Sequence, residues 1–213
     1  NTEYNVHVKC VVGEMQGMWS DVATFRTKNL MVDSVILSSE ANKEVFEDKL
    51  CEWCGTKNFE LLYRGSRDGF GASDFHRLCD NKGKTLIFVK NTSGHVFGGF
   101  ASVPWSSSNM YKAAPGSFLF TLTNMHGIQP TKFPLKNEND ENAVYHYSSS
   151  SGYMLAFGGG CDLYISSNCN TNTSSCTYFP STYNDTTGKG RSIFSSNTSD
   201  NFKVQDCEVF QVC

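Results

Sequence analysis

The chain begins with hydrophobic and polar residues in alternation, which is the pattern of a half-buried β-strand. Tyr4, Val6 and Val8 alternate with polar neighbours, and a second run with strand character, residues 19–27, follows a glycine-containing turn. We expect the two runs to pair as a hairpin. Since an isolated two-stranded hairpin is only marginally stable in water, residues 1–28 are interpreted as the end of a truncated module.

The period changes to that of a helix from Ser39 onward. Ser39 is suited to cap the start of this helix, and Gly55 is suited to end it because helices commonly stop at a glycine in the left-handed conformation. The hydrophobic residues that fall near one face between them are Ala41, Val45, Phe46, Leu50 and Trp53. The pattern therefore predicts one helix over residues 39–55.

Short strands separated by polar turns are predicted for most of the remaining chain. A strand at residues 59–64 is followed by a turn at residues 66–69 and a short helix over residues 73–79. The polar tract at residues 168–189 is expected to be the least ordered part, because Asn, Ser, Thr and Gly neither build a core nor hold a fixed helix. Further strands are expected at residues 118–123, 143–147, 162–166 and 206–212.

A second hairpin is predicted from residues 85–90 and 95–102, with turn residues between them. Gly98 and Gly99 lie inside its second strand, which suggests a bulge or a close approach of the backbone to a neighbour. The number and spacing of these strands are those of a sandwich. We therefore predict a mainly β fold with flanking helices (α+β), built as an antiparallel β-sandwich.

Composition supports this fold class and argues against two classes of function. Aromatic residues form 13% of the chain and charged residues only 18%, which points toward sheets and turns. The net charge is -3, without any run of Lys or Arg, so we expect no nucleic-acid partner. No stretch approaches the roughly twenty apolar residues that cross a bilayer. We therefore expect no membrane insertion and a cytoplasmic location.

The cysteines and histidines do not form a recognisable metal site. Nine cysteines are an odd number in a chain large enough to fold without cross-links, so most are interpreted as reduced. Cys51 and Cys54 have the spacing of half a zinc site or of a redox pair, but no second pair accompanies them, and we interpret them as two thiols of a helix. The histidines are scattered singly, which predicts no bound metal; they are His7, His76, His95, His126 and His146.

Patterns that would indicate an enzyme are also missing from the sequence. A nucleophile elbow requires Gly-x-Ser-x-Gly at a turn between a strand and a helix, and a phosphate-binding loop requires Gly-x-x-x-x-Gly-Lys followed by Ser or Thr. The chain has neither pattern. We therefore predict that it is not an enzyme and that it uses no cofactor.

Several short motifs occur in a fixed order along the chain. They are Phe59-Glu60-Leu61-Leu62-Tyr63-Arg64, Ser66-Arg67-Asp68-Gly69-Phe70, Phe75-His76, Val96-Phe97-Gly98-Gly99-Phe100, Trp105-Ser106, Phe157-Gly158-Gly159-Gly160, and the stretch from Phe202 to Val212. This ordered set resembles the TLDc domain family. Because the resemblance extends over about residues 32–212, residues 29–213 are assigned to a TLDc domain.

The resemblance implies a β-sandwich flanked by a few helices. It also implies protection against oxidative stress and, in several members, binding to the vacuolar proton pump (V-ATPase). Residues 1–28 resemble the last two strands of a fibronectin type III module, through Tyr-x-Val-x-Val, Trp-Ser and Phe-x-Thr. Some TLDc relatives carry the domain after a B-box, a coiled coil and fibronectin-type modules, so the chain would fit the terminal part of an adaptor.

One loop is the best sequence candidate for a partner-binding site. Arg64, Arg67, Asp68 and Phe70 place charged and aromatic side chains beside a glycine turn, where they can be exposed and can anchor a partner. We call these four residues the interaction loop. The competing interpretation is structural, since Arg67 and Asp68 can pair and organise the loop for the packing of Phe70.

Cys79 is the candidate redox thiol. His76 precedes it by three residues and shares its helix face, so the imidazole is placed to activate the thiolate. The alternative is that Cys79 is a small buried residue, which is the more common state of a free cysteine.

Three functional hypotheses follow. The first is a non-catalytic protein-interaction domain that binds and regulates V-ATPase, as the family resemblance implies. The second is a thiol-based antioxidant, which requires an exposed cysteine of low pKa and a resolving thiol nearby. The third is an architectural domain of a multidomain adaptor.

Overall fold

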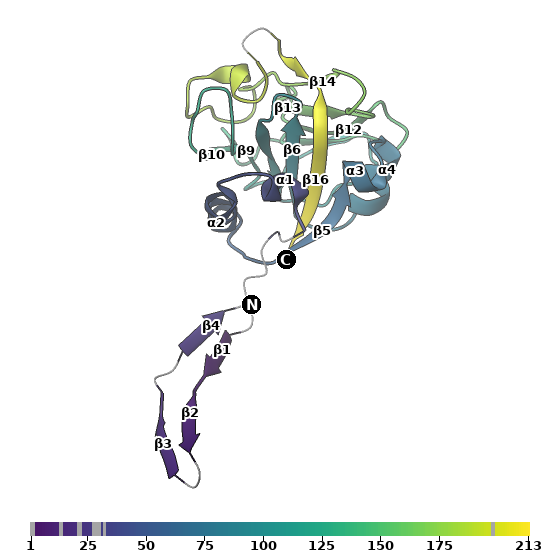
Figure 1. Cartoon of the computed structure of the whole chain (residues 1–213). Coiled ribbons are helices and arrows are strands. Elements are labelled where there is room, and N and C mark those ends of the chain that lie inside the picture. The colour runs from purple at the N-terminus through teal and green to yellow at the C-terminus, as the bar shows by residue number, and fades with distance from the viewer. Residues whose placement is uncertain (1–2, 13–14, 21–22, 27–30, 32, 197–198) are drawn as a thin grey trace.

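The protein folds as two six-stranded antiparallel sheets that pack against each other (Figure 1). The computed structural model describes residues 3–12, 15–20, 23–26, 31, 33–196 and 199–213. The strand order is β10-β9-β7-β6-β16-β5 in the first sheet and β15-β14-β13-β12-β11-β8 in the second sheet. This arrangement confirms the predicted antiparallel β-sandwich with flanking helices.

Every strand predicted between residues 59 and 212 is present, with its ends shifted by at most two residues. The first sheet consists of β5 (Phe59–Arg64), β6 (Thr85–Asn91), β7 (Val96–Ala101), β9 (Phe118–Thr121), β10 (Thr131–Pro134) and β16 (Val204–Val212). The second sheet consists of β8 (Met110–Lys112), β11 (Val144–His146), β12 (Tyr153–Phe157), β13 (Leu163–Ser166), β14 (Ser175–Cys176) and β15 (Asn201–Phe202).

The two glycines in β7 are required by close backbone approach and not by a bulge. The register between β6 and β7 runs without interruption, and it pairs Ile87 with Gly99 and Phe88 with Gly98. A Cβ atom on Gly98 would lie 1.8 Å from the carbonyl oxygen of Ile87. A Cβ atom on Gly99 would lie 2.6 Å from the ring of Phe157 in the facing sheet. Glycine at position 98 therefore fits against the backbone of β6, and glycine at position 99 lets the two sheets approach this closely.

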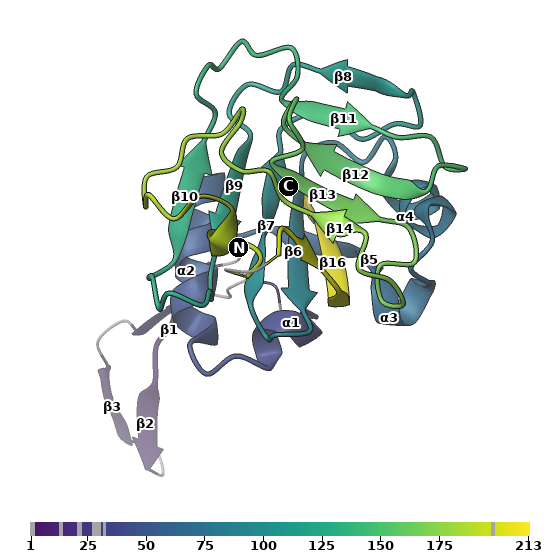
Figure 2. The same ribbon diagram turned by 90° about the horizontal axis from the view of Figure 1, so that it is seen from above.

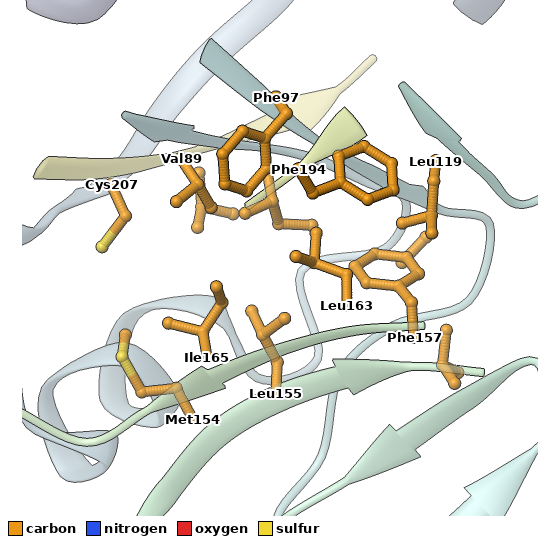
Figure 3. Packing of buried hydrophobic residues seen from close by; sticks show 14 of the residues in the cluster. Val89, Phe97, Leu119, Met154, Leu155, Phe157, Leu163, Ile165, Phe194 and Cys207 are labelled. Carbon is orange, nitrogen blue, oxygen red and sulfur yellow. The ribbon is translucent and has the colours of Figure 1, made fainter. Parts of the chain in front are cut away.

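The main core lies between the two sheets (Figure 3). Val89 and Phe97 of the first sheet meet Leu155, Phe157 and Leu163 of the second, and all five are fully or almost fully buried. The alternating direction of side chains along each strand places these residues inward. Each such side chain contributes about 1.5–3 kcal/mol through burial.

Two helices cover the outer face of the first sheet. They are α1 (Val35–Ser38) and α2 (Lys43–Cys54). Phe46 and Leu50 of α2 are buried against Phe88 and Phe120 of the sheet. Because the outer face of this sheet is apolar, the helices remove a second layer of hydrophobic surface from water.

The single helix predicted over residues 39–55 was wrong at its start. Ser39 ends α1 instead of starting a helix, because its hydroxyl donates to the carbonyl of Ile36 at 2.7 Å. The N-cap of α1 is Ser34, whose Oγ accepts from the backbone of Leu37. The predicted stop is confirmed, since Gly55 is left-handed with φ of 70°.

Two short helices follow β5 and pack at one end of the sandwich. The predicted turn at residues 66–69 is mostly one helical turn, α3 (Gly65–Asp68), and the next helix is α4 (Ala72–Cys79), close to its predicted position. Asp74 supports the start of α4, because its Oδ2 accepts from the backbone of Gly71 at 3.1 Å. A 3-10 helix, η1 (Gly190–Ile193), lies near the end of the chain.

The expectation of low order for residues 168–189 is contradicted by the structure. Phe179 and Tyr183 are fully buried in the main core, and the hydroxyl of Tyr183 donates to the carbonyl of Ala143 at 2.8 Å. Polar residues of the tract satisfy the backbone, as Asp185 does for the amides of Thr187, Gly188 and Gly190. Composition alone did not reveal that Phe179 and Tyr183 anchor this tract in the core.

The predicted N-terminal hairpin is confirmed as a long two-stranded ribbon, seen apart from the sandwich in Figure 1. In this ribbon β1 (Glu3–Val6) pairs with β4 (Ala23–Arg26), and β2 (Lys9–Val12) pairs with β3 (Met15–Trp19). The assignment of this ribbon to a fibronectin type III-like module stays a prediction.

Candidate interaction surface

Arg64 of the interaction loop is held by an internal carboxylate. Its Nε donates to Oε1 of Glu208 in β16 at 2.9 Å, and the side chains are 15% and 0% exposed. The same carboxylate accepts from the Ser34 hydroxyl at 2.5 Å and from the Val35 backbone at 2.9 Å. Arg64 and Glu208 therefore connect the first sheet to the start of α1 through hydrogen bonds. The sequence analysis did not predict this structural role.

Arg67 and Asp68 form a bidentate pair within the loop. Arg67 donates from Nε to Oδ1 and from Nη2 to Oδ2 of Asp68 at 2.9 and 2.8 Å. Asp68 also accepts from the backbone of Arg64 at 2.9 Å. The guanidinium of Arg67, together with that backbone hydrogen bond, lowers the pKa of the Asp68 carboxyl. The pair therefore organises the loop, in agreement with the structural interpretation.

Phe70 faces inward and not outward. It is half-buried and packs against the main core. Its ring lies so close to Gly65 that a Cβ atom there would be 2.4 Å from it. Arg67, with a side chain 44% exposed, is consequently the most accessible member of the interaction loop. The partner-binding role of this loop remains a prediction.

Cys79 lies at the end of α4 and is fully buried. Burial raises the pKa of its thiol, and the neighbouring Asp80 carboxylate adds to the effect. His76 does not activate it, because its Nδ1 is hydrogen-bonded to Oδ1 of Asp80 at 2.8 Å. Reaction with peroxide requires an exposed thiolate, and the burial and the raised pKa of Cys79 both disfavour that state.

A small polar cavity lies beside α4. It has a volume of about 320 Å³ and is lined by Ser73, His76, Arg77, Asp80, Ser107 and Ser149. Within the described part of the chain, no three His, Cys, Asp or Glu side chains gather as metal ligands. The nearby His146 is buried, and this lowers its pKa to about 4, so the imidazole is neutral at pH 7.

The second sheet carries a group of tyrosines on its outer face. We call Tyr111, Tyr145, Tyr147, Tyr153 and Tyr164 the tyrosine face. Tyr145 pairs with Tyr111 across β11 and β8, while Tyr164 of β13 lies opposite Ala156 and Cys176. Successive ring centroids, taken in the order 111, 145, 147, 153, 164, are 4.7, 4.5, 5.2 and 4.6 Å apart. The rings thus form one continuous aromatic surface across four strands and the β11–β12 connection.

The tyrosine face is uncharged and partly accessible, with Tyr164 buried and Tyr145 and Tyr147 half-buried. Tyr111 and Tyr153 are 40% and 38% exposed. Desolvation raises the pKa values of the Tyr111, Tyr147 and Tyr164 hydroxyls, so these groups stay neutral hydrogen-bond donors at pH 7. In Figure 2, α1 and α2 lie on the side of the first sheet and α3 and α4 lie at one end, so none of these four helices covers the tyrosine face.

The sequence contained only a weak signal for this surface. Tyr145 and Tyr147 alternate around the buried His146, which is the pattern of a strand with one aromatic outer face. The remaining members come from other strands, and only the cross-strand register places their rings together.

Comparison with known protein families places the chain in one of them, because the family model of the TLDc domain matches residues 31–213. The chain belongs to the TLDc domain family. Among curated proteins, this TLDc domain is similar to the MTOR-associated protein MEAK7 of Danio rerio, with 28% identity over 64 residues. That match covers 30% of the chain and 14% of the relative, so the chain corresponds to a small part of the relative's length. None of the described helices is long and apolar enough to span a membrane.

Proposed function

We propose that this TLDc domain is a non-catalytic, cytoplasmic interaction domain that binds a partner protein through the tyrosine face. The observation that carries the proposal is the uncovered aromatic surface on the second sheet, next to a first sheet whose outer face is covered by α1 and α2. Tyrosine is enriched at binding hot spots because its rigid ring buries a large area and its hydroxyl forms a hydrogen bond.

V-ATPase is the partner that we propose, on the basis of the resemblance to TLDc domains that bind this pump. The name of the Danio rerio relative, an MTOR-associated protein, also supports an interaction role for the family. Binding would act by competition or wedging at a subunit interface, which requires a large preformed surface and not a deep pocket. The rigid sheet beneath the tyrosine face provides such a surface.

The test is a titration of purified V-ATPase with this protein. ATP hydrolysis and retention of the catalytic sector on the membrane are both measured. The proposal expects a saturable loss of hydrolysis or release of the sector near stoichiometric amounts. If neither readout changes and the protein does not co-sediment with the pump, V-ATPase is excluded as the partner.

Two matched variants locate the binding surface. Tyr111→Arg places a charge on the tyrosine face, whereas Val45→Arg places one on the exposed side of α2, where Val45 is 52% exposed. Removal of a hot-spot contact costs about 2 kcal/mol, so we expect Tyr111→Arg to weaken binding more than tenfold and Val45→Arg to leave it unchanged. The reverse result would move the binding surface to the helical side.

Protection against oxidative stress is the physiological context that the family resemblance implies, and we propose it here for this domain. Survival of peroxide-treated cells that express wild type or Tyr111→Arg tests it. Equal protection by both proteins would separate this role from the tyrosine face.

A further inference from the structure

The two sheets have four edge strands, and three of these edges are occupied by groups of the chain itself. At β5, the backbone N–H of Arg64 donates to Oδ2 of Asp68 at 2.9 Å, and the carbonyl of Leu62 accepts from Nη2 of Arg67 at 3.1 Å. An edge strand directs every second N–H and C=O away from its neighbour, where another chain can pair with them. The Arg67–Asp68 pair therefore blocks the edge of the first sheet at β5.

Neighbouring groups also occupy the edges at β10 and β15. The carbonyl of Pro134, at the end of β10, accepts from the backbone of Asn184 at 2.8 Å, and proline has no N–H to offer. In β15, the hydroxyl of Ser199 accepts from the N–H of Asn201 at 3.1 Å and donates to its carbonyl at 3.2 Å. These contacts satisfy backbone groups that an added strand would need.

The fourth edge, β8, remains available. β8 ends the second sheet and pairs only with β11, and Figure 2 shows it as the outermost strand. The backbone of Gly158 donates to the carbonyl of Ala143, so Ala143 and Tyr145 direct their backbone groups toward β12. By alternation, the residues on either side of Tyr145 bond to β8, and Tyr111, opposite Tyr145, directs its N–H and C=O outward. Within the described part of the chain, no hydrogen bond reaches these two groups.

The side chains of β8 define the kind of segment that fits this edge. Met110 and Tyr111 are 52% and 40% exposed and lie on opposite faces of the sheet. Lys112 shares the face of Met110, and its ammonium donates to the neutral hydroxyl of Ser106 at 3.2 Å. Lys112 forms no ion pair with any carboxylate of the described residues. A strand with an acidic residue opposite Lys112 and an apolar residue opposite Met110 therefore complements this edge in charge and polarity.

We propose that the partner protein contributes an extended segment that adds to β8 as an antiparallel strand, with an acidic, an aromatic and an apolar residue opposite Lys112, Tyr111 and Met110. This inference rests on the proposed interaction function and specifies the chemistry of the partner. The antiparallel direction lets the central residue of the segment exchange two backbone hydrogen bonds with Tyr111. Its aromatic ring then extends the tyrosine face by one strand. Because β8 has three residues, the tyrosine face supplies much of the remaining contact area.

The direct test uses a synthetic peptide whose centre is Glu-Tyr-Leu, flanked by threonines and blocked at both ends. Fluorescence anisotropy measures its binding to the whole protein, and we expect a dissociation constant below about 1 mM. Hydrogen exchange should show new protection of the Tyr111 amide in the complex. Absence of binding would overturn the proposal. Sedimentation of the protein alone is measured as well, because a dimer that already protects the Tyr111 amide would make a second copy the occupant of this edge.

Two N-methylated peptides distinguish strand addition from contact of side chains alone. Methylation of the central tyrosine nitrogen removes a donor that faces Tyr111, and we expect binding to weaken by at least about tenfold. Methylation of the leucine nitrogen changes an N–H that points away from β8, so this peptide is the matched control and should bind like the parent. Equal effects of the two methyl groups would contradict the proposal.

The titration of V-ATPase separates this inference from the proposed partner. Tyr111→Ala removes the ring, whereas Tyr111→Pro removes the ring and the N–H, a change that sheet edges accept. With equal thermal midpoints, we expect Tyr111→Pro to weaken binding to the pump about tenfold more than Tyr111→Ala. Equal binding of the two variants would refute strand addition and leave the pump as partner. Binding of the peptide, without any effect of the wild type on the pump, would exclude V-ATPase and retain the strand site.

Discussion

Arg64 donates a hydrogen bond from Nε to Oε1 of Glu208 at 2.9 Å, and the Glu208 side chain is fully buried. The two residues are 144 positions apart in the chain. Their pair links β5, β16 and the start of α1, because Glu208 also accepts from Ser34 and Val35. Arg64 therefore has a structural function even though the sequence placed it in a partner-binding loop.

Glu208→Ala is expected to destabilise the fold by about 3–5 kcal/mol. Removal of one partner leaves the guanidinium of Arg64 and the hydroxyl of Ser34 buried without their acceptor. Urea unfolding measures the change. Lys49→Ala is the control, because the Lys49–Glu52 pair is exposed and should contribute less than about 1 kcal/mol. Equal effects of the two variants would mean that the buried pair is not coupled to folding.

Gly99→Ala is expected to cost about 1–3 kcal/mol, because the added methyl group overlaps the Phe157 ring and the sheets must separate to accept it. Gly98→Ala should cost more, since the obstacle is the backbone carbonyl of Ile87. Thermal unfolding measures both changes. Gly152→Ala has open space around the new methyl group and should leave the thermal midpoint almost unchanged.

Stability should rise with pH between about 4 and 6.5 through His146. Its pKa falls from 6.5 to about 4 on folding, chiefly because of burial and next because of the Lys112 ammonium, so in this window the unfolded chain binds the additional proton. Asp80 partly opposes the shift and His76 supports it. The contribution, on the order of 2 kcal/mol, is present above pH 6.5 and is lost as the pH falls toward 4.

The contribution of His146 is isolated by the difference between wild type and His146→Gln. Urea unfolding of both proteins at a series of pH values removes the common effect of the carboxylates. We expect the difference in unfolding free energy between wild type and variant to shrink as the pH is lowered. A difference that is constant over this range would show that His146 does not titrate as described.

Alkylation of the native protein should spare Cys79 and modify Cys213. Cys79 is fully buried and its thiol pKa is raised, whereas Cys213 is exposed. Mass spectrometry after a short treatment with iodoacetamide compares the two sites, and unfolding in urea should make both reactive. Native labelling of Cys79 at the rate of Cys213 would restore it as the candidate redox thiol.

Local patterns predicted most of the β-structure correctly. Residues 85–90 and 118–123, for example, are mostly apolar runs because the first sheet is buried on both faces, and such runs are readable from the chain itself. Helix boundaries were less accurate, because Ser39 can either start a helix or end one. The contact of its hydroxyl with the Ile36 carbonyl decided between them.

By itself, the sequence determined the fold class, the family and the positions of most strands of the first sheet, since periodicity and the order of motifs are properties of neighbouring residues. It did not predict β8, β10, β12, β14 or β15. The tertiary structure alone decided which distant side chains meet. The pair of Arg64 with Glu208 and the tyrosine face both depend on strand register and sheet packing. These contacts join residues far apart in the chain, so no local pattern encodes them.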